Sequence, residues 1–223
     1  MRRLIALCVL TGLAFALASC FNPFDPRVSQ ERVASVPAPE PTSPANMVRL
    51  FAWCWVNRDP ARYAEIFTDD YRFIFAPNDS AGNAFRDQPW LREDEMTMAQ
   101  HLFVGGTDRP PASSITVAID NNLAVLSDPR PGMTYAVHRS INVPVDVKVT
   151  ITDASGTPDV QPISGHALFY LVRGDSAVIP AELVKQGFKP DSTRWWIERW
   201  DDETLPVRGE GSSWMALKAA YWP

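Results

Sequence analysis

The chain has 223 residues, of which 21 are Lys or Arg and 26 are Asp or Glu, so its formal net charge at pH 7 is −5. A mildly acidic chain without a basic cluster lacks the electrostatic footprint of a nucleic-acid-binding protein, and we expect no nucleic-acid partner. Hydrophobic residues make up 46% of the chain, which is enough for one sizeable core.

The first 20 residues have the layout of a secretory signal. Arg2 and Arg3 precede an apolar run at residues 4–17, which ends in small residues and Cys20. The run is shorter than the roughly 20 residues that a membrane-spanning helix requires. We therefore favour a cleaved signal peptide over residues 1–19, with a spanning anchor as the alternative.

The sequence Leu17-Ala18-Ser19-Cys20 resembles the lipobox of bacterial lipoproteins. The resemblance implies cleavage before Cys20 and acylation of its sulfur, so that lipid chains such as palmitate attach the protein to a membrane. Several acyl chains on one residue give a stable anchor, whereas a single chain binds marginally. Phe21 stands where an Asp would resemble an inner-membrane retention signal. The expected location is the bacterial cell envelope, and in a Gram-negative host the outer membrane facing the periplasm.

Residues 20–43 are predicted to be a disordered tether that follows the acylated cysteine. The segment contains five prolines among small and polar residues, so it cannot bury enough apolar surface to fold. Prolines favour extended conformations, which makes the segment a semi-rigid spacer. We expect one folded domain over residues 44–203 and a C-terminal tail with a short helix over residues 204–223. Cys54 lies among aromatic residues and is expected to be a buried thiol without a disulfide partner.

Three helices are expected in the first half of the domain. Ser43-Pro44 is a favourable helix start, and apolar residues recur at helical spacing to about Val56. Asp59-Pro60 repeats this start before a shorter helix whose apolar face is Tyr63, Ile66 and Phe67. A short strand follows at residues 71–75, and a third helix is predicted over residues 90–104, where Gly105 ends it.

The second half of the chain alternates between apolar and polar residues. Residues 115–119 begin this pattern, and apolar residues occupy nearly all the odd positions over residues 135–151. Pro144 is expected to mark a bulge or bend in this long strand. Partner strands are predicted over residues 163–172 and 194–200. Helices followed by an antiparallel meander indicate an α+β fold, with the N-terminal helices packed on one face of a curved sheet.

This order of elements resembles the NTF2-like (SnoaL-like) superfamily, whose fold is a cone. The resemblance rests on Asn57-Arg58-Asp59 between the first two helices, on Asp69-Asp70-Tyr71-Arg72-Phe73, and on residues 90–95 and 195–202. It covers residues 43–203, and the whole chain also resembles bacterial lipoproteins built on this fold. The resemblance implies a sheet curled around a pocket. Members of the superfamily include isomerases, dehydratases, hydrolases and proteins that only bind or assemble, so the fold does not select an activity.

An enzyme of the isomerase type would need a carboxylate base facing a proton donor in an apolar cavity. Asp70, Asp120, Tyr63 and Tyr135 are residues of the required types, but their spacing does not place a base opposite a donor. We therefore assign no catalytic residue and favour a non-catalytic domain that binds a small apolar ligand or an envelope protein. An envelope enzyme of the isomerase or dehydratase type is the alternative. A homodimer that forms through the sheet face is also open.

Arg139 interrupts the apolar face of the long strand. One interpretation is a cation at the mouth of the pocket that binds an anionic ligand. The favoured alternative is a buried arginine paired with Glu95 or Glu198, or one that extends to solvent at the sheet edge. The candidate ligand-binding residues are Arg139, Tyr135 and His166. The three histidines are scattered and lack matching carboxylates, so we expect neither a metal site nor a cofactor.

Overall fold

The computed structural model describes residues 36–77, 79, 85, 88–107, 109–152, 155–204 and 213–222. The expected signal peptide, Cys20 and most of the expected tether lie outside the described residues. The chain divides into a unit of Met1–Pro37 and a unit of Ala38–Pro223. The second unit holds every element discussed below. No helix among the described residues is long and apolar enough to cross a bilayer.

Side-chain caps fix the starts of three helices. Ser43 precedes the first helix and its hydroxyl accepts a hydrogen bond from the Asn46 backbone at 3.1 Å. Asp59 caps the second helix in the same way, and Ser213 caps the last one. Within the described residues, the helices are α2 (Pro44–Asn57), α3 (Pro60–Ala64), α4 (Arg92–Val104), α5 (Ala181–Lys185) and α6 (Trp214–Tyr221).

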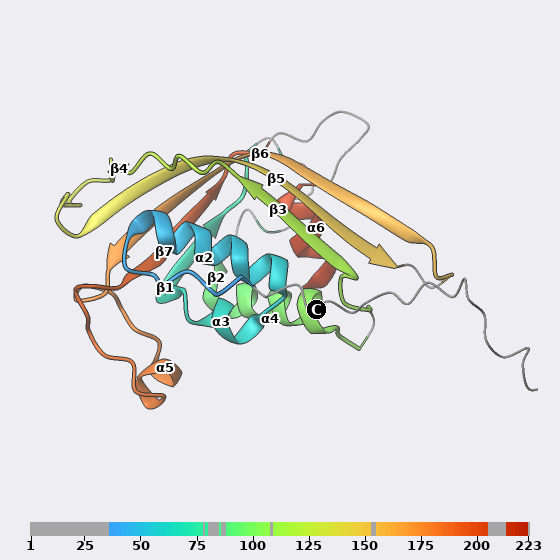
Figure 1. The fold of residues 1–223 in the computed structure, drawn as a ribbon, viewed down its shortest axis with the longest axis horizontal. Coiled ribbons are helices and arrows are strands. Elements are labelled where there is room, and N and C mark those ends of the chain that lie inside the picture. The colour runs from blue at the N-terminus through green and yellow to red at the C-terminus, as the bar shows by residue number, and fades with distance from the viewer. Residues whose placement is uncertain are drawn as a thin grey trace, which may run out of the picture. The chain divides into compact units, whose positions relative to one another are not determined.

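The strands form one sheet of seven strands (Figure 1). Its order is β2-β1-β7-β6-β5-β3, and β4 pairs with β5 outside this path. Every neighbouring pair is antiparallel except β1 and β7, which are parallel, so the expectation of a wholly antiparallel sheet is wrong at this point. Parallel neighbours require a long connection, and the elements β2 to β6 lie between these two strands along the chain. The strands are β1 (Phe67–Ile74), β2 (Trp90–Leu91), β3 (Ser114–Ile119), β4 (Leu126–Ser127), β5 (His138–Thr152), β6 (Pro158–Arg173) and β7 (Trp195–Asp202).

The hairpin of β5 and β6 is the longest pairing in the sheet. Its register runs from His138 opposite Val172 to Thr152 opposite Pro158 without a shift. The bulge expected at Pro144 is therefore absent from this ladder. β3 ends opposite Val145, so Pro144 has no β3 neighbour, and proline is tolerated at such a local edge. Register shifts occur instead between β6 and β7 and between β1 and β7.

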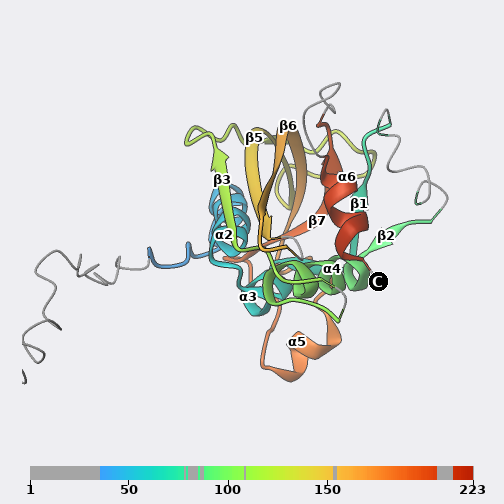
Figure 2. The ribbon, with the colours of Figure 1, turned by 90° about the vertical axis from the view of Figure 1, so that its right-hand side faces the viewer.

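The helices α2, α3, α4 and α6 lie on the concave side of the curved sheet, whereas α5 lies apart from them (Figures 1 and 2). We call the curved sheet with these four helices the cone. Alternation along β5 points its odd-numbered apolar side chains into the cone, where Ile141, Val143, Val147 and Val149 are fully buried. The α+β fold class expected from the sequence is confirmed, with helices packed on a curved and open sheet.

Several element boundaries differ from the sequence-based expectation, among them the start of β6, which begins at Pro158 and not at residue 163. The second helix ends at Ala64, and Phe67 begins β1 instead of extending the helix. Trp90 and Leu91 do not begin the third helix but form β2, which pairs with β1. Leu91 was expected to face the core, but it is 40% exposed. Tyr135 lies in a turn before β5, because the His138 backbone N–H donates to Thr134 at 2.8 Å.

The domain includes residues on both sides of the expected range 44–203. On the N-terminal side, the Trp195 backbone donates to the Pro41 carbonyl at 2.9 Å, and Ala38 packs against the core. On the C-terminal side, we expected a tail with a short helix. That helix is α6, and its Trp214, Met215 and Tyr221 are buried in the same core as the sheet.

Candidate functional site

The interior of the cone contains a buried carboxylate, Glu95 of α4. The Tyr63 hydroxyl donates to Glu95 Oε1 at 2.7 Å, and the Trp90 indole N–H donates to Oε2 at 2.9 Å. The Lys218 ammonium of α6 donates to the same Oε2. Neither Glu95 nor Lys218 has any exposed side-chain surface. Both carboxylate oxygens therefore accept hydrogen bonds, and the donors come from α3, β2 and α6.

Helical spacing explains how Glu95 reaches the interior. Glu95, Met98, Ala99 and Leu102 are all buried, and their spacing places them on one face of α4. The neighbours Glu93 and Asp94 point away from that face, and Asp94 Oδ2 accepts from the Leu91 backbone at 2.9 Å at the start of the helix. Of the three consecutive acidic residues at 93–95, only Glu95 is therefore buried in the core.

Three aromatic rings also lie close to the Lys218 ammonium. The Lys218 nitrogen lies 4.2 Å from the centre of the Phe73 ring, 4.6 Å from that of Trp200 and 5.6 Å from that of Trp90. Such distances allow cation–π attraction. Burial lowers the pKa of Lys218, while Glu95 opposes that change. Burial, with a contribution from the Glu95 charge, raises the pKa of Tyr63 well above its ordinary value.

Aromatic side chains fill the cone next to this pair. Phe51 packs edge-on against Phe169 and Trp200, in each case with ring centres 5.0 Å apart. Trp214 of α6 packs edge-on against Trp200 at 4.7 Å and against Trp55 at 5.0 Å. These rings and the absence of exposed surface on Glu95 leave the carboxylate without access from solvent.

The surface formed by the described residues includes two pockets. One has a volume of about 250 Å³ between the ends of α4 and α6, where His101, Arg109 and Tyr221 contribute to its wall. The second has a volume of about 140 Å³ and lies beside Phe73 and Phe85. Neither is lined by Glu95 or Lys218.

Asp202 at the end of β7 is a second buried carboxylate. Its Oδ1 accepts from the Thr204 backbone at 2.8 Å and from the Thr204 hydroxyl at 2.5 Å. Burial raises the pKa of Asp202 to about 6, against the lowering effect of these hydrogen bonds and of the Lys218 charge. Asp202 therefore changes its charge at about pH 6, well above the usual range of an aspartate.

The structure brings two of the three candidate ligand-binding residues together. The Arg139 guanidinium lies 3.3 Å from the centre of the Tyr135 ring and 5.7 Å from that of Trp195. It also donates to the His138 carbonyl at 3.0 Å. The ion pair considered for Arg139 is not formed, because Glu95 binds Lys218 and Glu198 binds Arg130.

The third candidate, His166, lies elsewhere on the sheet and is exposed. Its Nδ1 lies 2.9 Å from the Asn142 amide oxygen, and the Asn142 amide nitrogen donates to Glu203 at 2.8 Å. Arg139, Tyr135 and His166 therefore do not form one site. The other residues considered for catalysis, Asp70 and Asp120, are exposed. Within the described ranges, no group of three or more His, Cys, Asp or Glu has a metal-binding arrangement.

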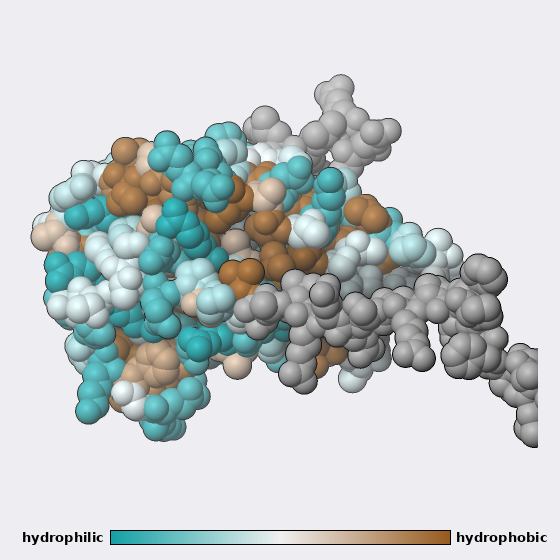
Figure 3. All heavy atoms as spheres, in the orientation of Figure 1, coloured by the Kyte–Doolittle hydropathy of each residue, from teal (hydrophilic) through white to brown (hydrophobic). Residues whose placement is uncertain are grey.

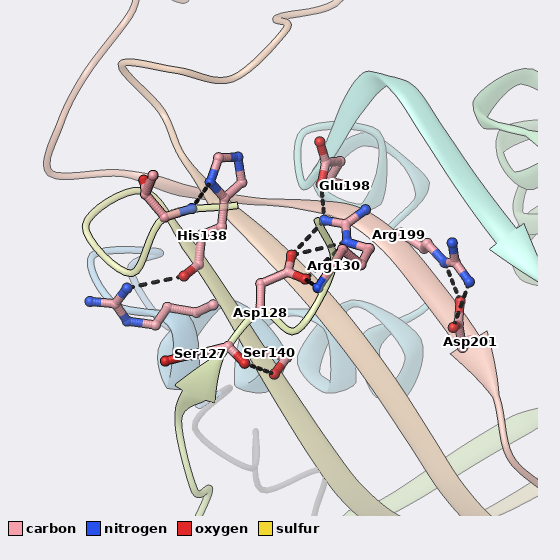
Figure 4. Close-up of polar contacts among 10 residues, drawn as sticks. Ser127, Asp128, Arg130, His138, Ser140, Glu198, Arg199 and Asp201 are labelled. Carbon is pink, nitrogen blue, oxygen red and sulfur yellow. Dashed lines mark hydrogen bonds and ion pairs between the residues drawn. The ribbon is translucent and has the colours of Figure 1, made fainter. Parts of the chain in front are cut away.

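A polar cluster that the sequence did not indicate lies where the 128–130 loop meets β6 and β7 (Figure 4). Arg130 Nε donates to both oxygens of Asp128 at 3.0 Å, and its terminal nitrogen donates to Asp128 and Glu198. Its guanidinium lies 4.5 Å from the centre of the Tyr170 ring, and that of Arg199 lies 5.4 Å from it. Burial lowers the pKa of Arg130, but the bonds to Asp128 and Glu198 outweigh it and raise the pKa. The cluster joins the loop to the sheet, and no local sequence pattern predicts it.

No protein-family model and no curated protein matches the chain. Solved structures do resemble it. A putative scytalone dehydratase from Novosphingobium aromaticivorans has a TM-score of 0.46 at 12% identity, over 75% of this chain and 87% of that one. A ketosteroid isomerase-like protein from Erwinia carotovora atroseptica has a TM-score of 0.42 at 13% identity, over 72% and 92%. A protein from Kribbella flavida has a TM-score of 0.49 at 12% identity, over 78% and 92%. At these levels the neighbours say nothing of this chain's activity.

Proposed function

We propose that the chain is a lipid-anchored protein of the bacterial envelope whose NTF2-like domain is non-catalytic and acts by binding a partner. One observation supports the absence of catalysis. Tyr63, Trp90 and Lys218 all donate hydrogen bonds to Glu95, which lies in an interior without solvent access. A general base must come within hydrogen-bond reach of a substrate proton, directly or through one water. Glu95 offers no free oxygen and no approach for such a substrate.

Because the interior is closed, we place partner binding on the surface of the domain. Leu126 of β4 is 56% exposed, and Tyr135 is 59% exposed above Arg139. On the face shown in Figure 3, apolar residues gather in the region of β4 and over the middle of the sheet, with polar residues between them. Exposed apolar groups with a polar surround are typical of protein contact surfaces. They support a protein partner in the envelope more than a small ligand held inside the cone.

The lipid anchor rests on the lipobox-like sequence that ends at Cys20. Metabolic labelling with a fatty-acid analogue tests it directly. The wild-type chain is expected to incorporate the label and to sediment with membranes. The Cys20→Ser chain is expected to remain unlabelled, and labelling of this variant would contradict the anchor.

One observation favours the alternative of an isomerase or dehydratase. Tyr63 and Glu95 form the buried pair of donor and carboxylate that such chemistry uses, at 2.7 Å. The Cys20→Ser chain can therefore be titrated with a panel of polycyclic and aromatic carbonyl compounds while its Trp fluorescence is followed, since Trp90 and Trp200 lie beside Glu95. The non-catalytic proposal predicts no saturable change. Saturable binding that is lost in Glu95→Gln would instead support an enzyme site.

A further inference from the structure

The surroundings of the Lys218 ammonium form a complete binding site for a cation. The Glu95 carboxylate contacts it, and the ring centres of Phe73, Trp200 and Trp90 all lie within 5.6 Å of it. Aromatic rings present a negative face to a cation, and proteins recognise ammonium ligands with such cages. Neither Lys218 nor Glu95 has exposed side-chain surface, and such burial strengthens the attraction relative to the same contacts in water.

The cage and its occupant come from different parts of the fold. The residues that surround the ammonium belong to β1, β2, α4 and β7, all within residues 67–202. The occupant belongs to α6, the last helix of the described chain, Trp214–Tyr221. Truncation of the Lys218 side chain therefore leaves every group of the cage in the chain.

The charges facing the ammonium are few and can be named. Glu95 of α4 makes the direct contact, and Asp202 of β7 adds a second attractive charge. A buried ion pair alone is a weak explanation for such an arrangement, because a well-packed apolar pair of similar volume is often as stable. An ion pair does not require the three aromatic rings. The rings make the site selective for a cation over a neutral group of the same size.

We propose that this cage is an ammonium-binding site whose ligand class is a primary alkylammonium with a short apolar stem. Lys218 is its intramolecular ligand, and α6 holds that ligand in place. A free amine of this class takes the place of the Lys218 ammonium, against Glu95 and the three rings, once the Lys218 side chain is truncated. The inference goes beyond the proposed function and holds whether or not the domain has an activity.

The test removes the Lys218 side chain from the cage and adds a free amine that contains the same atoms. Lys218→Ala in the full-length chain removes three methylene groups and the ammonium, which n-propylamine restores. We expect the melting temperature of this variant to rise by about 5–10 °C at a hundredfold excess of n-propylamine over its Kd. n-Propanol, which has the same size without the charge, is expected to give no comparable rise. If Lys218→Ala does not fold alone, its refolding yield from urea is measured against the concentration of each compound.

Two variants are matched controls. Lys218→Met fills the space with an apolar chain and is expected not to respond to n-propylamine. The double variant Glu95→Gln, Lys218→Ala lacks the carboxylate and is expected to lose the response. An equal response to n-propanol, or no response of Lys218→Ala in either melting or refolding, would overturn the ammonium site. None of these results depends on whether Cys20 is acylated or on whether the chain is an enzyme.

Discussion

Lys218 and Glu95 form an ion pair inside the cone in which neither side chain is exposed. The pair joins α6, at the end of the chain, to α4, which precedes most of the sheet in sequence. Because Tyr63 and Trp90 also donate to Glu95, the pair is hydrogen-bonded as well as charge-balanced. A buried charge is tolerated in an apolar interior only under these conditions.

Removal of one partner is therefore predicted to cost more than removal of both. Glu95→Gln leaves the Lys218 ammonium buried without a counter-charge, and we expect the free energy of unfolding to fall by about 3–5 kcal/mol. The double variant Glu95→Gln, Lys218→Met buries no charge and is expected to recover most of that loss. Urea unfolding with unchanged slopes measures both effects. A double variant that loses the sum of the two single losses would contradict the coupling.

Asp202 is predicted to make the domain less stable as pH rises from about 4 to about 6. Its pKa is raised from 3.8 to about 6 by burial, so the folded state binds a proton that the unfolded state has already released in this window. The loss is expected to approach about 3 kcal/mol once the pH has passed the folded-state pKa, at about 1.4 kcal/mol per pKa unit. Asp202→Asn keeps an oxygen for the two Thr204 donors and is expected to lack this loss. Parallel stability curves for the two chains would refute the assignment.

The Cys54 thiol is predicted to be unreactive in the folded chain. It is fully buried, and burial raises its pKa to about 12, so almost no thiolate is present at neutral pH. Labelling of the Cys20→Ser chain with iodoacetamide, followed by peptide mass spectrometry, is expected to modify Cys54 only when denaturant is added. Rapid modification of Cys54 under native conditions would show that α2 does not pack as described.

Arg130 is predicted to stabilise the loop that it joins to the sheet. Asp128 has no exposed side-chain surface, so Arg130→Lys, which cannot form the paired contacts, leaves that carboxylate poorly satisfied. We expect a loss of about 2 kcal/mol in the free energy of unfolding. Arg199→Lys is the matched control, because Arg199 also stacks near Tyr170 but its partner Asp201 is partly exposed. A loss below 1 kcal/mol is expected there, and equal losses would argue against the burial of Asp128 as the cause.

Local sequence patterns predicted most of the helices and strands. The arrangement of the buried site depends on contacts between residues far apart in the sequence. Ser43-Pro44 indicated the start of α2, and the alternation along residues 141–149 correctly indicated the buried face of β5. These signals are local because caps and periodicity depend on neighbours in sequence. The parallel pairing of β1 with β7 has no such signal.

The Glu95–Lys218 pair could not be predicted for the same reason. Glu95 was considered only as a partner for Arg139, and no local pattern singled out Lys218. Only the packing of α6 into the cone brings the two side chains together, across 123 residues of sequence. The rings of Phe73, Trp90 and Trp200 converge on this ammonium only through the register of three strands.

Reductive methylation of the native chain tests the sealed interior most directly. Lys148, Lys185 and Lys189 are exposed and serve as internal controls, whereas Lys218 is fully buried against Glu95. Peptide mass spectrometry is predicted to find the three exposed lysines dimethylated and Lys218 unmodified until denaturant is added. Methylation of Lys218 at the rate of the exposed lysines would contradict the closed cone and the proposal that Lys218 is its internal ligand.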